Sequence, residues 1–244
     1  TGGVIRTALG FSGNRADFTP TAGTIELYSS SDAYISQSNG CTFHNVNINK
    51  SAKNASAGDP VLPISADRID LTAGNGGKAN IIYLSSNIFI TNNLTISAGT
   101  LSIGPYTMNA AKTVDIYGGL EMTDAAGIFN VGTVAYDNMW FRNGSSANLS
   151  AGNINLNSWL AVDAGSSFLA TTGNTIHVIG GNYSGGLGNS EPTAVFGNVE
   201  INKSVTSPTF FASDYTGPYN IAGNFTIQAN NSFQAGTNAV HVTG

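Results

Sequence analysis

The sequence contains few charged residues, and this scarcity excludes several classes of protein. Asp, Glu, Lys and Arg make up 9% of the 244 residues, against about 25% in an ordinary soluble domain. The formal net charge is −5, and the Lys and Arg residues form no cluster. Nucleic-acid binding requires basic side chains that neutralise phosphates, so we expect no nucleic-acid partner.

Cysteine and long apolar segments are also nearly absent. Cys41 is the single cysteine, which excludes an internal disulfide, and we interpret it as a small residue packed within a strand. No apolar run approaches the roughly 20 residues of a membrane helix, so we expect no membrane span. The start at Thr1 lacks the charged and apolar regions of a signal peptide. We therefore expect a mature chain or a segment of a longer chain.

Apolar-polar-apolar triplets are the dominant pattern in the sequence. This period-two alternation is typical of short, half-buried strands, in which the apolar pair points inward and the middle residue outward. The triplets begin at Ile25, Val46, Ile69, Leu94, Leu101, Val114, Leu120, Ile154, Ile176, Val199, Phe225 and Val240. No stretch carries a helical stripe, so we expect an all-β fold.

Clusters rich in Gly and Asn separate these strands, for example at residues 73–77, 97–99, 117–119 and 180–182. Gly and Asn adopt the positive φ angles that tight corners need. Short strands joined by such corners build a sandwich, a barrel or a solenoid.

A longer repeat favours the solenoid. The block Phe43–Ser51 returns as Phe196–Ser204, at an offset of 196 − 43 = 153 residues. A stack of coils accommodates such a restart because each coil needs only its neighbours. We therefore expect residues 1–244 to form a single right-handed parallel β-helix, with a super-repeat whose units lie near 23–51 and 173–204. At about 20–25 residues per coil, the chain would hold roughly ten coils. The alternative is a tandem pair of antiparallel β-sandwiches.

Specific motifs support a family resemblance. The block Phe43–Ser51 and its copy are accompanied by Asn93-Leu94-Thr95-Ile96 and Tyr106-Thr107-Met108. These motifs resemble the Phe-x-Asn-Leu-x-Ile-Asn-Lys repeat region of large bacterial surface proteins secreted by the type IX route. The resemblance starts only after about Thr21. It implies an extracellular β-helical stalk, adhesin or filament at the cell surface, and it implies no reaction.

Candidate contact residues are few. Lys50 and Lys203 recur at equivalent places in the repeat, either as partner contacts or as strand-end lysines that keep edges soluble. Trp140, Trp159 and Tyr183 are aromatic residues that could stack on sugar rings or pack in turns. His177 and His241 also recur, but no third metal ligand accompanies them. We expect no catalytic residue, no cofactor and no metal site.

Two functional hypotheses follow. The first is an extracellular structural or adhesive scaffold, as a subunit or repeat of a surface filament or stalk. It would associate end to end with itself or with neighbouring domains of the same chain, and glycans are a further candidate partner. The alternative is a carbohydrate-binding or polysaccharide-cleaving β-helix, which requires acids and aromatics that converge on one face. Five acids (Glu26, Asp70, Asp115, Glu121 and Glu200) occupy outward triplet positions, but no basic residue recurs beside them, so we expect a protein that is not an enzyme.

Overall fold

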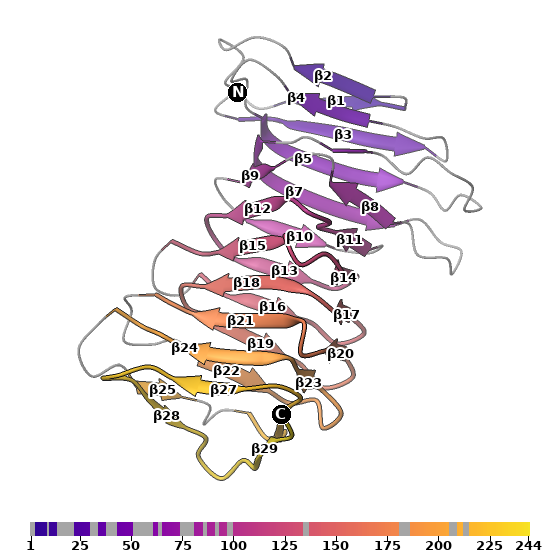
Figure 1. The fold of residues 1–244 in the computed structure, drawn as a ribbon. Helices are drawn as coiled ribbons and strands as arrows, with labels where there is room; N and C mark the ends of the chain where they lie inside the picture. The colour runs from indigo at the N-terminus through magenta and orange to yellow at the C-terminus, as the bar shows by residue number, and fades with distance from the viewer. Residues whose placement is uncertain are drawn as a thin grey trace.

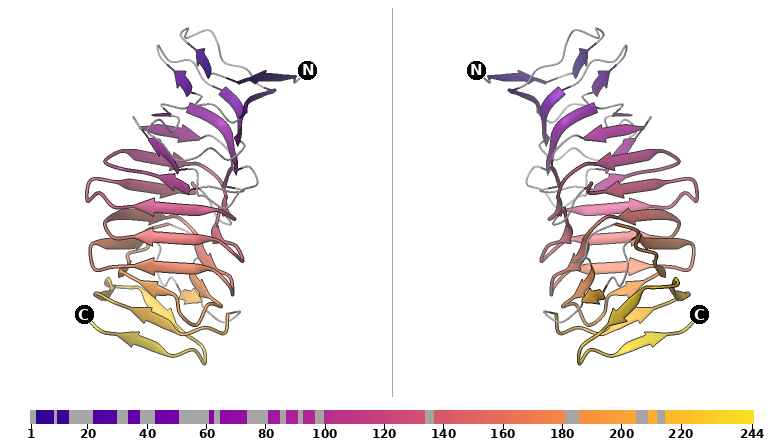
Figure 2. Two further views of the ribbon diagram at one scale, coloured as in Figure 1. Left: turned by 90° about the vertical axis from the view of Figure 1, so that its right-hand side faces the viewer. Right: turned by 90° about the vertical axis from the view of Figure 1, so that its left-hand side faces the viewer.

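The fold is a stack of short parallel strands. The computed structural model describes residues 3–8, 10–13, 22–29, 34–37, 43–50, 61–62, 65–73, 81–84, 87–90, 93–96, 100–133, 137–180, 186–204, 209–211 and 215–244. Within these residues the regular secondary structure consists of β-strands, and every pair of hydrogen-bonded strands is parallel. The N- and C-termini lie at opposite ends of the stack (Figures 1 and 2). The expected all-β parallel solenoid is confirmed, and the antiparallel sandwich is wrong for the described residues.

Three walls surround the core. Wall A contains β10 (Leu94–Ile96), β13 (Val114–Ile116), β16 (Met139–Phe141), β19 (Trp159–Val162) and β22 (Gly186–Asn189). Wall B contains β9 (Ile88–Ile90), β12 (Thr107–Ala110), β15 (Ile128–Val131), β18 (Gly152–Leu156), β21 (Asn174–Val178), β24 (Asn198–Ile201) and β27 (Phe225–Ile227). Wall C contains β6 (Val61–Leu62), β8 (Ile81–Leu84), β11 (Thr100–Ser102), β14 (Gly119–Met122), β17 (Ser146–Leu149), β20 (Ser167–Ala170), β23 (Val195–Phe196), β26 (Tyr219–Ile221) and β29 (Val240–Val242).

Walls A and B merge near the N-terminus in one long strand. In β7 (Ser65–Ala73), Ala66 pairs with Ile90 of wall B, while Ile69 pairs with Leu94 of wall A. The strands β1 (Val4–Thr7), β3 (Thr24–Ser29) and β5 (Phe43–Lys50) continue the stack beyond β7. Two small sheets accompany the ends of the stack, β2 (Gly10–Gly13) with β4 (Tyr34–Gln37) and β25 (Thr209–Phe211) with β28 (Ser232–Gln234).

A turn of the solenoid passes through walls A, C and B in that order. About 6 such turns are present, from β7–β9 to β22–β24. The expected ten coils are therefore more than the structure shows, because the described strands beyond these turns do not extend all three walls together. Turn length varies from 119 − 100 = 19 residues to 187 − 160 = 27 residues between paired positions. The corners absorb this variation, since the strands keep their register.

The core consists of the inward residues of the triplets. Leu94 and Ile96, Val114 and Ile116, and the equivalent pairs up to Val199 and Ile201 are buried. Most of the middle residues are partly exposed, and Ser102 is buried. Buried aromatic rings form a column along the axis. Consecutive centroids lie 4.9 Å apart for Phe141 and Phe168, 5.1 Å for Phe168 and Phe196, and 6.2 Å for Phe196 and Tyr219. The alternation read from the sequence thus predicts which side chains form the core.

The two copies of the long repeat lie on different walls. In the first copy, Val46 pairs in register with Ile69, which in turn pairs with Leu94 of wall A. In the second copy, Val199 stacks on Ile176 of wall B. The 153-residue offset therefore does not return the chain to the same wall. The expected handedness and the super-repeat remain predictions.

Candidate functional site

The outward face of wall A brings together the two tryptophans that the sequence singled out. The register pairs Asp115 with Trp140 and Trp140 with Ala161 on three consecutive turns. Trp159 precedes Ala161 by two residues on the same strand, so the alternation places both on the same face. Trp140 and Trp159 are both partly exposed and lie on the neighbouring strands β16 and β19.

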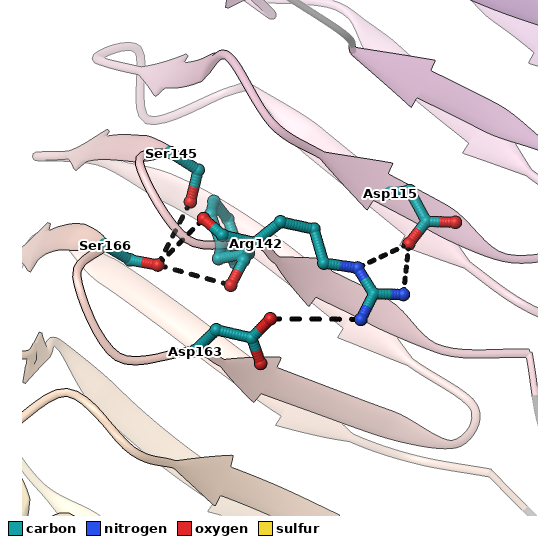
Figure 3. Close-up of polar contacts among 6 residues, drawn as sticks. Asp115, Arg142, Ser145, Asp163 and Ser166 are labelled. Carbon is teal, nitrogen blue, oxygen red and sulfur yellow. Dashed lines mark hydrogen bonds and ion pairs between the residues drawn. The ribbon is translucent and has the colours of Figure 1, made fainter.

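Arg142 joins three turns on this face, as Figure 3 shows. Its Nε and one terminal nitrogen donate hydrogen bonds of 2.9 and 2.6 Å to Oδ1 of Asp115 on the preceding turn. Its other terminal nitrogen lies 3.9 Å from Oδ2 of Asp163 on the following turn. The guanidinium carbon also lies 4.3 Å from the ring centroid of Trp140. We name these residues, together with Trp159, the arginine–tryptophan cluster.

Backbone contacts hold Arg142 in place. The strand ends at Phe141, and Arg142 N donates to the carbonyl of Ile116 on the preceding turn at 2.8 Å. The buried Ser166 hydroxyl donates to the Arg142 carbonyl at 3.0 Å and lies 3.3 Å from the Ser145 hydroxyl (Figure 3). Because hydrogen bonds hold both the N–H and the carbonyl of Arg142, the backbone of this corner determines where the guanidinium group lies.

The next corner along the stack is fixed by a buried carboxylate. Glu191 accepts hydrogen bonds from the hydroxyl of Thr193 at 2.6 Å, from Thr193 N at 3.0 Å and from Gly165 N at 2.8 Å. These bonds, that of the Thr193 hydroxyl first, lower the pKa of Glu191. A carboxylate that satisfies backbone donors in this way stabilises the corner while it is ionised.

Small residues continue the face beyond the cluster. Ala161 is fully buried although it points outward, and a Cβ added to Gly188 would overlap the ring of Tyr215. The Tyr215 ring therefore covers the outer side of wall A at Gly188. The sequence showed the tryptophans but not this contact, because it joins residues 215 − 188 = 27 positions apart.

Wall B carries a different polar row. Asn130 donates to Asn109 at 2.8 Å and Asn155 donates to Asn130 at 2.7 Å, so amides bond from turn to turn. Further along, His177 Nδ1 lies 2.8 Å from Glu200 Oε2. His177 is thus placed beside a carboxylate of the next turn, and the described residues contain no group of three side chains suited to a metal.

The remaining predicted contact residues have different outcomes. Lys203 is only 4% exposed and its Nζ has no hydrogen-bond partner among the described residues, so it is not the surface contact that the repeat suggested. Burial lowers its pKa. Lys50 ends β5, but its side chain lies outside what the structure describes, and Tyr183 lies outside the described residues.

Sequence reasoning missed Arg142 and Asp163. Arg142 lies two residues after Trp140, and two residues is the strand period that puts side chains on one face. That spacing could have identified Arg142. Asp163 could not be found, because its place beside Arg142 depends on the 21-residue length of the intervening turn, 163 − 142.

The three walls and their outward polar rows define the class of the protein as a parallel β-solenoid. A scan against protein-family models, a search of curated proteins and a search of solved structures each found no match. Across the residues with described structure, no helix has the length and apolarity of a membrane span.

Proposed function

We propose that the chain is an extracellular structural and adhesive scaffold, a repeat or subunit of a filament or stalk on the bacterial cell surface. The observation that carries the proposal is the use of outward polar side chains as contacts between turns. Asp115 and Arg142, Ser102 and Glu121, and His177 and Glu200 each join neighbouring turns. Such contacts add stiffness along the axis of a solenoid.

The acids provide further support for a role without catalysis. A hydrolase or lyase needs carboxylates available to the substrate. Every acid whose side chain is described has a hydrogen bond or ion pair with another group of the chain: Glu26, Asp115, Glu121, Asp124, Asp137, Asp163, Glu191 and Glu200. These pairings favour structural use of the acids.

The two ends of the stack support association through added turns. The exposed apolar residues at one end include Val4 and Ile5 on β1. At the other end, Ile227 is 42% exposed and Val242 is 46% exposed. Exposed strand edges with apolar residues pair readily with further strands. In the proposed assembly, a second copy or a neighbouring domain of the same chain stacks here.

Sedimentation velocity and electron microscopy of the isolated chain test the proposal. Association into rods or fibres that lengthen with concentration is the expected result. Ile227→Asp should shorten the assemblies, because it places a charge in the contact between ends. Leu169→Asp is the matched control, since Leu169 is exposed on the outer face of wall C. A folded chain that stays monomeric at every concentration would contradict end-to-end association.

The cellular location needs a separate experiment. An antibody against the chain should label intact cells of the source bacterium, and permeabilisation should add little signal. Labelling that appears only after permeabilisation would exclude the surface location.

A further inference from the structure

The outward face of wall A concentrates aromatic residues. The chain has 2 tryptophans, and both lie on this face, on adjacent strands. The register places Trp159 beside residue 138, two positions before Trp140. With strands about 4.8 Å apart and about 3.3 Å per residue, the Cα atoms of Trp140 and Trp159 lie about 8 Å apart. Tyr117, which directly follows β13, is half exposed, and the register places it opposite Arg142, two positions further along the wall than Trp140.

Fixed polar groups lie beside these rings. Arg142 is held by Asp115 and faces Asp163, whose side chain is 34% exposed. One guanidinium and two carboxylates give the cluster a formal charge of −1, in a chain whose net charge is −5. This balance disfavours an anionic ligand, while carboxylate and guanidinium groups both form hydrogen bonds with neutral hydroxyls.

The other walls offer less to a ligand. On wall B the amides of Asn109, Asn130 and Asn155 bond to one another. On wall C the outward residues include Ser146, Asn148 and Ser167, with Leu169 as an exposed apolar side chain. The combination of stacking surface and fixed hydrogen-bonding groups therefore lies on wall A.

We propose that this face binds a neutral polysaccharide of flat, equatorially linked pyranoses, such as a β-linked glucan. The apolar faces of the sugar rings stack on Trp159 and Tyr117, and the sugar hydroxyls bond to Arg142 and Asp163. Aromatic rings favour such contacts because they present a large, rigid apolar surface. This inference rests on the proposed adhesive function and names the ligand of that function.

Fluorescence titration and calorimetry with cellohexaose test the inference. Because both tryptophans lie in the site, their emission reports binding directly. We expect saturable binding by the full chain and at least about a tenfold loss of affinity in Trp159→Ala, a loss of about 1.4 kcal/mol. Leu169→Ala is the matched control and should bind like the parent. Trp159→Phe, which keeps a ring, should recover part of the affinity if Trp159→Ala is poorly folded by circular dichroism.

Three results would overturn the inference. The first is no signal with cellohexaose up to about 10 mM, the range of very weak complexes. The second is unchanged affinity in folded Trp159→Ala. The third is tighter binding of polygalacturonate or maltohexaose, an acidic and a helical glycan. Assembly measured without sugar is independent of all three, so the scaffold proposal can stand or fall separately.

Discussion

Arg142 and Asp115 lie 27 residues apart in the sequence and share two hydrogen bonds through a single carboxylate oxygen. Both side chains are less than one third exposed. The pair joins β13 to the corner after β16, so it ties one turn to the next on the outer side of wall A. Its contribution to stability is open to direct measurement.

We predict that Arg142→Ala lowers the free energy of unfolding by about 1–2 kcal/mol, since it removes a partly screened ion pair and the contact with Trp140. Arg142→Lys should recover little, because an ammonium cannot reproduce the forked geometry. Urea denaturation measures both. In a double-mutant cycle with Asp115→Ala, a coupling energy of zero would show that the pair contributes nothing.

Phe168 and Leu169 offer a matched test of the core, because they are neighbours that point to opposite faces of wall C. Phe168 is buried between Phe141 and Phe196, while Leu169 is exposed. Phe168→Ala should cost about 3–5 kcal/mol and Leu169→Ala less than about 0.5 kcal/mol. Similar losses for both variants in thermal and urea denaturation would mean that the two faces are assigned wrongly.

Lys203 should reduce stability at neutral pH, because its charged amine is buried without a partner among the described residues. Burial lowers the pKa of Lys203 in the folded state. Between that value and the unfolded value of about 10.4, the unfolded chain binds more protons, so stability rises with pH in this window. Lys203→Met should stabilise the fold by about 1 kcal/mol near pH 7 and remove this rise. Urea denaturation across the pH range checks both effects. A loss of stability in Lys203→Met would indicate that the amine has a stabilising partner.

Glu191 should stabilise the fold only while it is ionised. Its pKa is lowered in the folded state, so its contribution is present above the unfolded value of about 4.3 and is lost as pH falls through the folded value. Glu191→Gln keeps the size but removes the charge, and it should flatten the acid limb of the stability curve. Denaturant midpoints from about pH 3 to about pH 6 measure this. An unchanged acid limb would assign that limb to other carboxylates.

The sequence predicts the core of this fold well and its outer contacts poorly. In triplets such as Val114-Asp115-Ile116, the sequence shows which side chains point inward, because strand geometry alone decides their direction. The contact between Arg142 and Asp163 needs the exact length of a turn, and turn lengths vary from 119 − 100 = 19 to 187 − 160 = 27 residues between paired positions. Lys203 illustrates the same limit. It is equivalent to Lys50 in the sequence repeat, but it follows a strand of a different wall, and the Lys203 side chain is buried there.

Each turn is hydrogen-bonded to the turn before it and to the turn after it, and this arrangement has a mechanical consequence. In walls A, B and C the backbone hydrogen bonds run along the stack axis, so tension along that axis loads the three ladders together. Rupture should then start at the turn with the weakest ladders and leave distant turns intact. Extension would proceed in discrete steps, each releasing one turn of chain, and the intact part would keep its cross-section throughout.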